Sequence, residues 1–184
     1  PSAASPRAAH EQLVEGQRLP RAARGDAADG AVVLDKLFQD VAGKNPFRAV
    51  GDRYVGRLAG ATGALEVGPG LGALTGGLLE RAGSVTAVEI DAGFARFLSQ
   101  RFAGNARLKL IHGDFLKMAP ELGFTKAVSN LPYYCSSEAL FRIASDYRIP
   151  SVYVMLQREM ARRVTAAPGS PEYGALSVSL GIYY

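Results

Sequence analysis

Short apolar runs alternate with amphipathic segments from about residue 31 to the end of the chain, and this alternation constrains the fold most. We expect strands at residues 64–67, 84–90, 108–111, 127–129, 152–156 and 175–184. We expect helices at residues 32–41, 53–61, 71–81, 92–102, 137–145 and 158–165. Strands that alternate with helices usually form a parallel sheet with helices on both faces. The sequence therefore predicts an α/β, Rossmann-like fold with a mostly parallel sheet.

Two of these helices have predicted inward faces. In 71–81 the inward residues are Leu71, Leu74, Leu78 and Leu79, and in 92–102 they are Phe94, Phe97, Leu98 and Phe102.

Composition bounds the number of domains and the kind of partner. At 184 residues and 48% hydrophobic content, the chain can bury one core. Residues 1–30 are rich in Ala, Arg and Pro, so we expect a disordered extension, with an organelle presequence as the alternative. Residues 31–184 form the predicted domain and carry the net charge of +4, which weakly favours a phosphate-bearing partner.

The rarer residue types exclude several kinds of site. One cysteine and two histidines give little basis for a disulfide framework or a metal site. No apolar run approaches the roughly 20 residues of a membrane span. We therefore expect no metal, no membrane and a reducing compartment, the cytoplasm, with mitochondrial or nucleolar alternatives.

A glycine loop follows the strand at 64–67. Gly68 and Gly70 lie between a strand and a helix, where backbone can approach a ligand and the helix N-terminus favours negative charge. The spacing lacks the third glycine of the dinucleotide fingerprint, and a turn that only packs strand on helix looks similar. Glu89 ends the next strand, where an acid binds ribose hydroxyls in both nicotinamide and S-adenosylmethionine sites.

Two further strand ends carry candidate side chains. Asp114 could accept a hydrogen bond from an adenine amine, with Phe115 beside the ring, although an acid and an aromatic often end a strand without function. Asn130, Leu131, Pro132 and Tyr133 follow the strand at 127–129 and offer an amide, a carbonyl and an aromatic face. These groups can hold a planar base with an exocyclic amine, and their alternative role is structural. The two loops together point to methyl transfer onto an amino group.

The ordered set of motifs resembles the rRNA adenine dimethyltransferase family, which includes KsgA and Erm enzymes. The resemblance runs from about residue 43 to 184 and rests on residues 65–75, 88–91, 113–115 and 130–133. Residues 155–159 and 173–178 resemble the KsgA branch. The family implies a class I S-adenosylmethionine-dependent methyltransferase fold.

The resemblance also implies roles for individual residues. Glu66, Gly68 and Gly70 would border the methionine part of S-adenosylmethionine, and Glu89 and Ile90 would hold its ribose and adenine. Asp114 and Phe115 would bind the cofactor's adenine. Asn130 and the Leu131 carbonyl would hold the target amine, with Asn130 also near the cofactor, and Tyr133 would stack on the target base.

Two departures from the family pattern matter. The segment that caps the cofactor's methionine end is matched only by residues 43–47, where Lys44 replaces glutamine and Asn45 is the candidate contact. The family continues past the equivalent of Tyr184 with a strand and a small helical domain. We therefore expect a methyltransferase domain that is incomplete at its C-terminus.

The sequence thus predicts a KsgA-like enzyme that dimethylates adenine amines of small-subunit rRNA as a monomer. Arg158, Arg162 and Arg163 are candidates for RNA contacts, although each could lie on an ordinary solvated face. One alternative is an Erm-like enzyme acting on large-subunit rRNA. Another is a non-catalytic rRNA-binding assembly factor or mitochondrial transcription factor, and a nicotinamide dehydrogenase fits less well.

Overall fold

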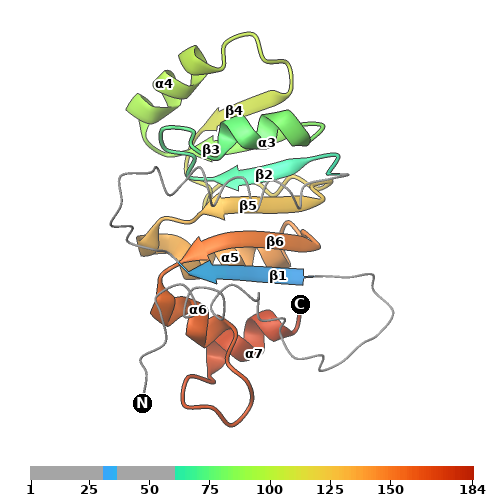
Figure 1. Ribbon diagram of the computed structural model, residues 1–184, viewed down its shortest axis with the longest axis vertical. Helices are drawn as coiled ribbons and strands as arrows, with labels where there is room; N and C mark the ends of the chain where they lie inside the picture. The colour runs from blue at the N-terminus through green and yellow to red at the C-terminus, as the bar shows by residue number, and fades with distance from the viewer. Residues whose placement is uncertain (1–30, 37–60) are drawn as a thin grey trace, which may run out of the picture.

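A six-stranded sheet forms the centre of the protein (Figure 1). The computed structural model describes residues 61–184 and, for the backbone alone, residues 31–36. The strand order is β1-β6-β5-β2-β3-β4, and every neighbouring pair is parallel. The strands are β1 (Ala31–Lys36), β2 (Ala64–Val67), β3 (Val85–Glu89), β4 (Leu108–His112), β5 (Lys126–Asn130) and β6 (Ser151–Leu156). The predicted parallel α/β architecture is confirmed.

Helices cover both faces of the sheet, with α3 in front of it and α5 behind it in Figure 1. The helices are α3 (Thr75–Arg81), α4 (Ala92–Arg101), the short 3₁₀ turn η2 (Tyr133–Cys135), α5 (Ser136–Ser145), α6 (Arg158–Val164) and α7 (Ala175–Gly181). One apolar core joins α5, α6 and α7 to the sheet, and a second joins α3 to the opposite face. β2 and β3 are buried along their whole length, as expected for strands covered on both sides.

The last element is a helix, so the strand predicted at 175–184 is wrong. Leu176 and Leu180 are four residues apart and both are buried, which is helical spacing. Ser177 donates a hydrogen bond to the Arg163 carbonyl and so joins α7 to α6. The alternating apolar residues suggested a strand because the run is short enough to fit either period.

The helix predicted at 32–41 is also wrong over residues 32–36, which form β1 beside β6. Consecutive β-branched residues, Val32 and Val33, favour a strand there. The rest of that prediction lies outside the described residues. The same holds for residues 53–60 of the helix predicted at 53–61, for the extension at 1–30 and for Asn45.

Two helices face the core differently from the prediction. Phe94 and Phe97 are each 42% exposed, whereas Ala95 and Leu98 of α4 are buried. Leu71 precedes α3 and is 58% exposed. Ala95 and Leu98 therefore form the buried side of α4, and the two phenylalanines lie on its more exposed side. Leu74, Leu78 and Leu79 are buried as predicted.

Candidate active site

The carboxyl ends of the strands lie at one edge of the sheet because all strands run in parallel (Figure 1). The chain runs outward from β2 through β3 to β4, then returns to the other side of β2 to form β5. Ligands of open α/β sheets bind where the strand order reverses in this way, outside the carboxyl ends. The crevice between β2 and β5 is therefore the expected place for a site, and the candidate residues of β2, β3, β4 and β5 lie at or just after the carboxyl ends of these strands.

The glycines of the loop after β2 have different roles. Gly68, Gly70 and Gly72 all have positive φ angles, of 69°, 56° and 76°. A Cβ on Gly72 would lie 2.7 Å from Leu98 Cδ2, so Gly72 is needed for packing against α4. A Cβ on Gly70 would meet no atom within 4 Å. The loop thus packs strand on helix at Gly72 and leaves open space at Gly70.

Glu89 connects the end of β3 to the glycine loop. Its side chain is buried, with one carboxylate oxygen accepting from the Gly70 amide and the other from the Asp91 amide, both at 2.9 Å. A carboxylate has about four acceptor positions, so both oxygens can still accept from a ligand. Ile90 follows Glu89 and is 52% exposed, which leaves an apolar face beside the carboxylate.

Glu66 is the most deeply buried acid of the site. It is 1% exposed and accepts a hydrogen bond of 2.7 Å from the Thr75 hydroxyl. Burial raises the pKa of Glu66 from 4.5 to about 8, the Thr75 hydrogen bond opposes this rise and the charge of Glu89 adds to it. Sequence analysis missed Thr75, although its place at the start of the helix after the glycine loop is a usable signal.

Asp114 and Phe115 follow β4 but differ in exposure. Asp114 accepts a hydrogen bond from the Leu116 amide at 3.0 Å, and Lys117 Nζ lies 3.4 Å from its carboxylate. Phe115 is 4% exposed, and its ring stacks on Tyr147 with centroids 5.1 Å apart. Asp114 is therefore near the surface of the site, whereas the ring of Phe115 belongs to the core.

Arg142 of α5 holds this loop in place, although sequence patterns did not predict this role. Its guanidinium donates to the Phe115 and Met118 carbonyls at 2.6 and 2.7 Å and to Asp146 at 3.0 Å. The same group lies over the rings of Phe115 and Tyr147. Its two carbonyl acceptors are 24 and 27 positions away in the chain, so no local pattern could reveal the contact.

The loop after β5 contains an unpaired polar atom. Asn130 Oδ1 is buried and has no hydrogen-bond partner in the described part of the chain. A buried acceptor without a partner is rare and costly, so it calls for a functional explanation. Leu131 is buried, whereas Tyr133 of the same loop is 53% exposed and presents an aromatic surface. The Pro132 carbonyl accepts from the Cys135 amide and the Ser136 hydroxyl, which fixes the loop to α5.

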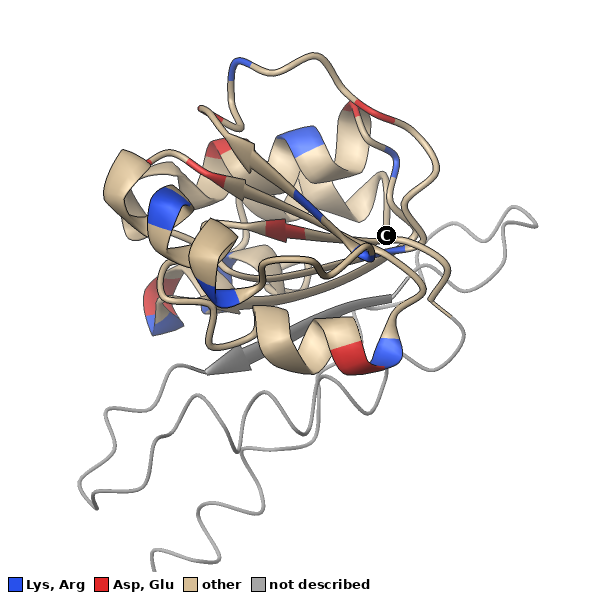
Figure 2. Ribbon diagram, turned by 90° about the horizontal axis from the view of Figure 1, so that it is seen from above, with Lys and Arg blue, Asp and Glu red and all other residues tan. Residues whose placement is uncertain are grey.

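Arg158, Arg162 and Arg163 are exposed on α6, which begins just after the carboxyl end of β6. None of the three forms an ion pair within residues 61–184. Basic and acidic positions are interspersed along the described ribbon in Figure 2. The helix that carries the three arginines therefore begins at the same edge of the sheet as the candidate site.

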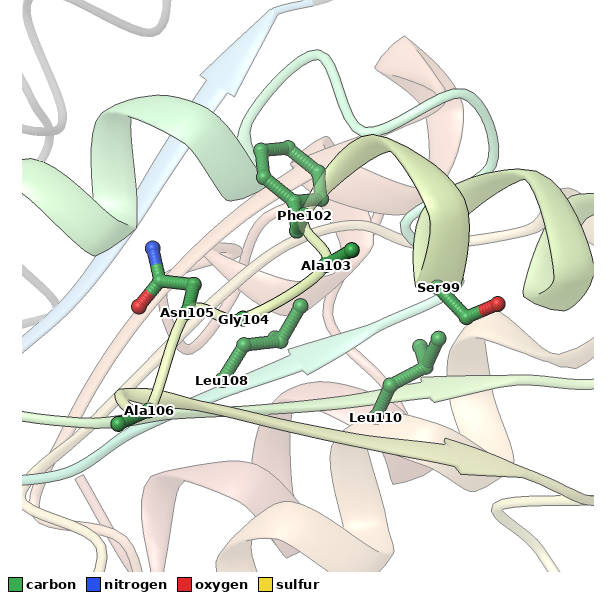
Figure 3. Close-up of a pocket in the computed structure, with 8 residues that line it drawn as sticks. All are labelled: Ser99, Phe102, Ala103, Gly104, Asn105, Ala106, Leu108 and Leu110. Carbon is green, nitrogen blue, oxygen red and sulfur yellow. The ribbon is translucent and has the colours of Figure 1, made fainter.

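A hollow lies away from this edge, between the end of α4 and β4 (Figure 3). Its lining includes Phe102, Leu108 and Leu110, and its only polar side chains are those of Ser99 and Asn105. It lacks charged groups, so it offers less to a nucleoside than the edge with Glu89 and Asn130. No cluster of metal-ligating side chains occurs among the described residues, and no helix described is long and apolar enough to span a membrane.

Comparison with known proteins identifies the family. Residues 57–184 match the family described as ribosomal RNA adenine dimethylase. The chain belongs to this family. A probable ribosomal RNA small subunit methyltransferase A of Natronomonas pharaonis is 43% identical over 144 residues, which cover 73% of this chain and 52% of that protein. The ribosomal RNA small subunit methyltransferase A of Shouchella clausii is 40% identical over 132 residues, which cover 66% and 44%.

Solved structures support the same assignment within the dimethylase family. A dimethyladenosine transferase from Plasmodium falciparum superposes with a TM-score of 0.64 at 29% identity, covering 74% of this chain and 50% of that one. The 23S rRNA methyltransferase ErmE gives 0.55 at 28%, covering 70% and 52%. The predicted class I S-adenosylmethionine-dependent methyltransferase fold is therefore confirmed. The chain spans about half the length of the curated relatives it matches.

Proposed function

We propose that this chain is the catalytic domain of an S-adenosylmethionine-dependent enzyme that dimethylates the exocyclic amine of adenines in small-subunit rRNA. The observation that carries the proposal is the buried Oδ1 of Asn130, which has no partner in residues 61–184 and lies at the point where the strand order reverses. An amine N–H donor would satisfy this atom. The names of the relatives support small-subunit rRNA as the substrate.

The residues of the edge fit S-adenosylmethionine. Glu89 has acceptor positions left for ribose hydroxyls, and Ile90 offers an apolar face for the adenine. Among the described residues, no atom lies within 4 Å of a Cβ built at Gly70, so the cofactor could approach the backbone there. Glu66, in the strand before this loop, would border the methionine end. Asp114 is placed to accept from the cofactor's adenine amine. When bound, the cofactor supplies a methyl group already activated by its sulfonium.

The protein's task is then to orient the acceptor nitrogen. The lone pair of an adenine amine is delocalised into the ring, so the nitrogen is a poor nucleophile while it stays planar. Asn130 Oδ1 and the Leu131 carbonyl accept its two N–H groups and favour a pyramidal nitrogen with its lone pair directed at the methyl. Positioning and preorganised acceptors of this kind lower barriers by several kcal/mol. A second transfer requires one of these contacts to be given up.

Reaching the amine requires the base to leave its stack in the RNA. Enzymes that modify bases extrude the target nucleotide and hold it against aromatic side chains. Tyr133, half exposed beside Asn130, is the side chain for this stacking. Arg158, Arg162 and Arg163 on the neighbouring helix would hold backbone phosphates. We place the enzyme as a monomer with ribosomal precursors in the cytoplasm, with mitochondria or the nucleolus as alternatives.

The test is transfer of labelled methyl from S-adenosylmethionine to undermethylated small ribosomal subunits. Large subunits and the Asn130→Ala protein are run alongside. We expect dimethyladenosine in the small subunit alone, and a loss of about 100-fold or more with Asn130→Ala. Label in the large subunit would favour an Erm-like enzyme. Cofactor binding without transfer, together with ribosome assembly supported by Asn130→Ala, would favour a non-catalytic assembly factor.

A further inference from the structure

The two loops of the site are joined by one buried side chain that the proposed roles do not use. The backbone pairing of β2 with β5 joins Ala64 with Lys126 and Leu65 with Ala127. Both strands continue beyond these pairs toward the site. There, the Val67 amide donates a hydrogen bond of 2.8 Å to the hydroxyl of Ser129, which is 1% exposed. A side chain thus links the strands where the backbone pairing has ended.

The same junction also contains a direct contact between the loops. A Cβ on Gly68 would lie 3.0 Å from Cγ of Pro132. The glycine loop therefore lies directly against the loop of residues 130–133, called the acceptor loop below. Val67 precedes Gly68, and Ser129 precedes Asn130. The hydrogen bond therefore joins the residue just before the glycine loop, which would hold the methyl donor, to the residue just before Asn130, which would hold the target amine.

Each loop is otherwise fixed to its own neighbours. The Gly68 amide donates to the Val88 carbonyl of β3, and Glu89 holds the Gly70 amide. The acceptor loop is fixed to α5 through the Pro132 carbonyl. Among the described residues, the bond from Val67 to Ser129 is the side-chain hydrogen bond that ties these two units together at the carboxyl edge.

We propose that Ser129 is a positioning residue, whose hydroxyl sets the separation between the methyl donor on the glycine loop and the amine held by Asn130. The proposal rests on the function proposed above. Methyl transfer needs the reacting atoms close and aligned, and a misplacement of about 1 Å can cost about 100-fold in rate. Alanine at this position would leave the buried Val67 amide without an acceptor, so the two strand ends would separate to admit a new partner.

Three substitutions of Ser129 distinguish the effect of its hydroxyl as an acceptor from the effect of its side-chain volume. Ser129→Ala removes the acceptor, Ser129→Cys fills the space with a weak acceptor, and Ser129→Thr keeps a hydroxyl. The matched control is Thr125→Val. The Thr125 hydroxyl donates to the Gly63 carbonyl at 3.1 Å, so it ties the segments that precede β5 and β2 at the opposite edge of the sheet.

The first readout is the split between catalysis and binding. We measure single-turnover methyl transfer to small subunits, and S-adenosylmethionine affinity by calorimetry. Ser129→Ala and Ser129→Cys should lower the transfer rate by about 10-fold or more with little change in cofactor affinity. Ser129→Thr and Thr125→Val should transfer like the wild type.

The second readout needs no cofactor. Amide hydrogen exchange at Val67 should become faster in Ser129→Ala and stay unchanged in Thr125→Val. Wild-type transfer rates in Ser129→Ala would overturn the positioning role, as would equal losses in Ser129→Ala and Thr125→Val. If the wild-type chain binds cofactor but methylates neither subunit, the proposed function fails and the positioning role fails with it. Normal transfer by the wild type together with normal transfer by Ser129→Ala removes the positioning role alone.

Discussion

The cofactor side and the acceptor side of the site differ in how completely their polar groups are paired. On the cofactor side, both oxygens of Glu89 already hold backbone amides, and Glu66 accepts from Thr75. On the acceptor side, Asn130 Oδ1 is buried without a partner among the described residues, and Tyr133 is half exposed. The polar groups of the first side are therefore paired without a ligand, whereas the second side keeps an acceptor that the proposed target amine would meet.

This difference fits the two ligands that we propose. A cofactor that is used in every turnover benefits from a preorganised site, because few side chains then lose conformational entropy when it binds. A target base must enter from an RNA fold and leave again after modification, so its site needs unmet acceptors and an open aromatic surface. The comparison predicts that substitutions on the two sides change different measured quantities.

Removing the Glu89 carboxylate should have the largest effect on the cofactor side. Glu89→Ala leaves the Gly70 and Asp91 amides without acceptors and removes the group proposed to hold the ribose. Because a hydrogen bond to a charged group contributes about 1.5–3 kcal/mol, we expect the Kd for S-adenosylmethionine to rise about 100-fold. Calorimetric titration measures this change.

The control for Glu89 is Glu121→Ala. Glu121 is an exposed acid paired with Lys109 at 2.7 Å, away from the carboxyl edge. Its removal should leave the Kd unchanged. Equal Kd values for wild type and Glu89→Ala would show that the preorganised acid does not serve the cofactor.

Removing the Tyr133 ring should act on the acceptor side alone. Base–aromatic stacking is worth about 1–3 kcal/mol per base, so Tyr133→Ala should lower kcat/KM for small subunits about 10-fold while the cofactor Kd stays constant. Tyr133→Phe keeps the ring and should retain activity. Tyr134 is the neighbouring control, since it is 73% exposed and follows the proposed contact. Losses of equal size in Tyr133→Ala and Tyr134→Ala would contradict the assignment.

Substitutions of two glycines in the same loop should distinguish a position needed for packing, Gly72, from a position needed for cofactor binding, Gly70. Gly72→Ala places a Cβ 2.7 Å from Leu98 and should lower the free energy of unfolding by about 1–3 kcal/mol. Gly70→Ala carries similar backbone strain, because both glycines have positive φ, but it meets no neighbour. It should therefore lose less stability and more cofactor affinity. Chemical denaturation and calorimetry on both variants test this, and the reverse ranking in both measurements would contradict it.

Sequence patterns predicted the fold where burial alone decides the structure. The strands from β2 to β6 were predicted to within one or two residues, because apolar runs between turn signals have few alternatives. The errors fall on short segments with mixed patterns. Residues 175–184 alternate like a strand, yet Leu176 and Leu180 are buried on one side of a helix. Packing against α6 decided between the two periods, and packing is not visible in a local window.

The site shows the same division. The order of strands in a parallel sheet places Glu66, Glu89, Asp114 and Asn130 at one edge, so their convergence was predictable. The contacts of Ser129 with Val67 and of Arg142 with Phe115 were not. They join residues 62 and 27 positions apart, and serine or arginine at such positions is unremarkable in a sequence. Contacts of this kind depend on how strands separate and how loops close.

The last prediction concerns the pH dependence of stability through Glu66, the buried acid of the cofactor side. Its pKa is about 8 in the folded protein against an ordinary 4.5, so between these pH values the folded protein keeps a proton that the unfolded chain has released. Stability therefore falls as pH rises through this window, with a slope of at most about 1.4 kcal/mol per pH unit, and the loss is absent below it. Thermal unfolding of the cofactor-free protein measures how stability changes with pH. The range from about pH 5 to about pH 8 covers the window between the two pKa values of Glu66.

Glu66→Gln isolates the contribution of Glu66 to the pH dependence of stability from that of the other titrating groups. The glutamine side-chain oxygen can still accept from Thr75, so the hydrogen bond is kept while the titration is removed. The variant should show a flatter dependence of stability on pH than the wild type, with the two curves converging at the acid end. Parallel curves across the window would mean that Glu66 titrates near its ordinary value. The cofactor side would then hold an ionised acid before binding, and its preorganisation would be electrostatic as well as geometric.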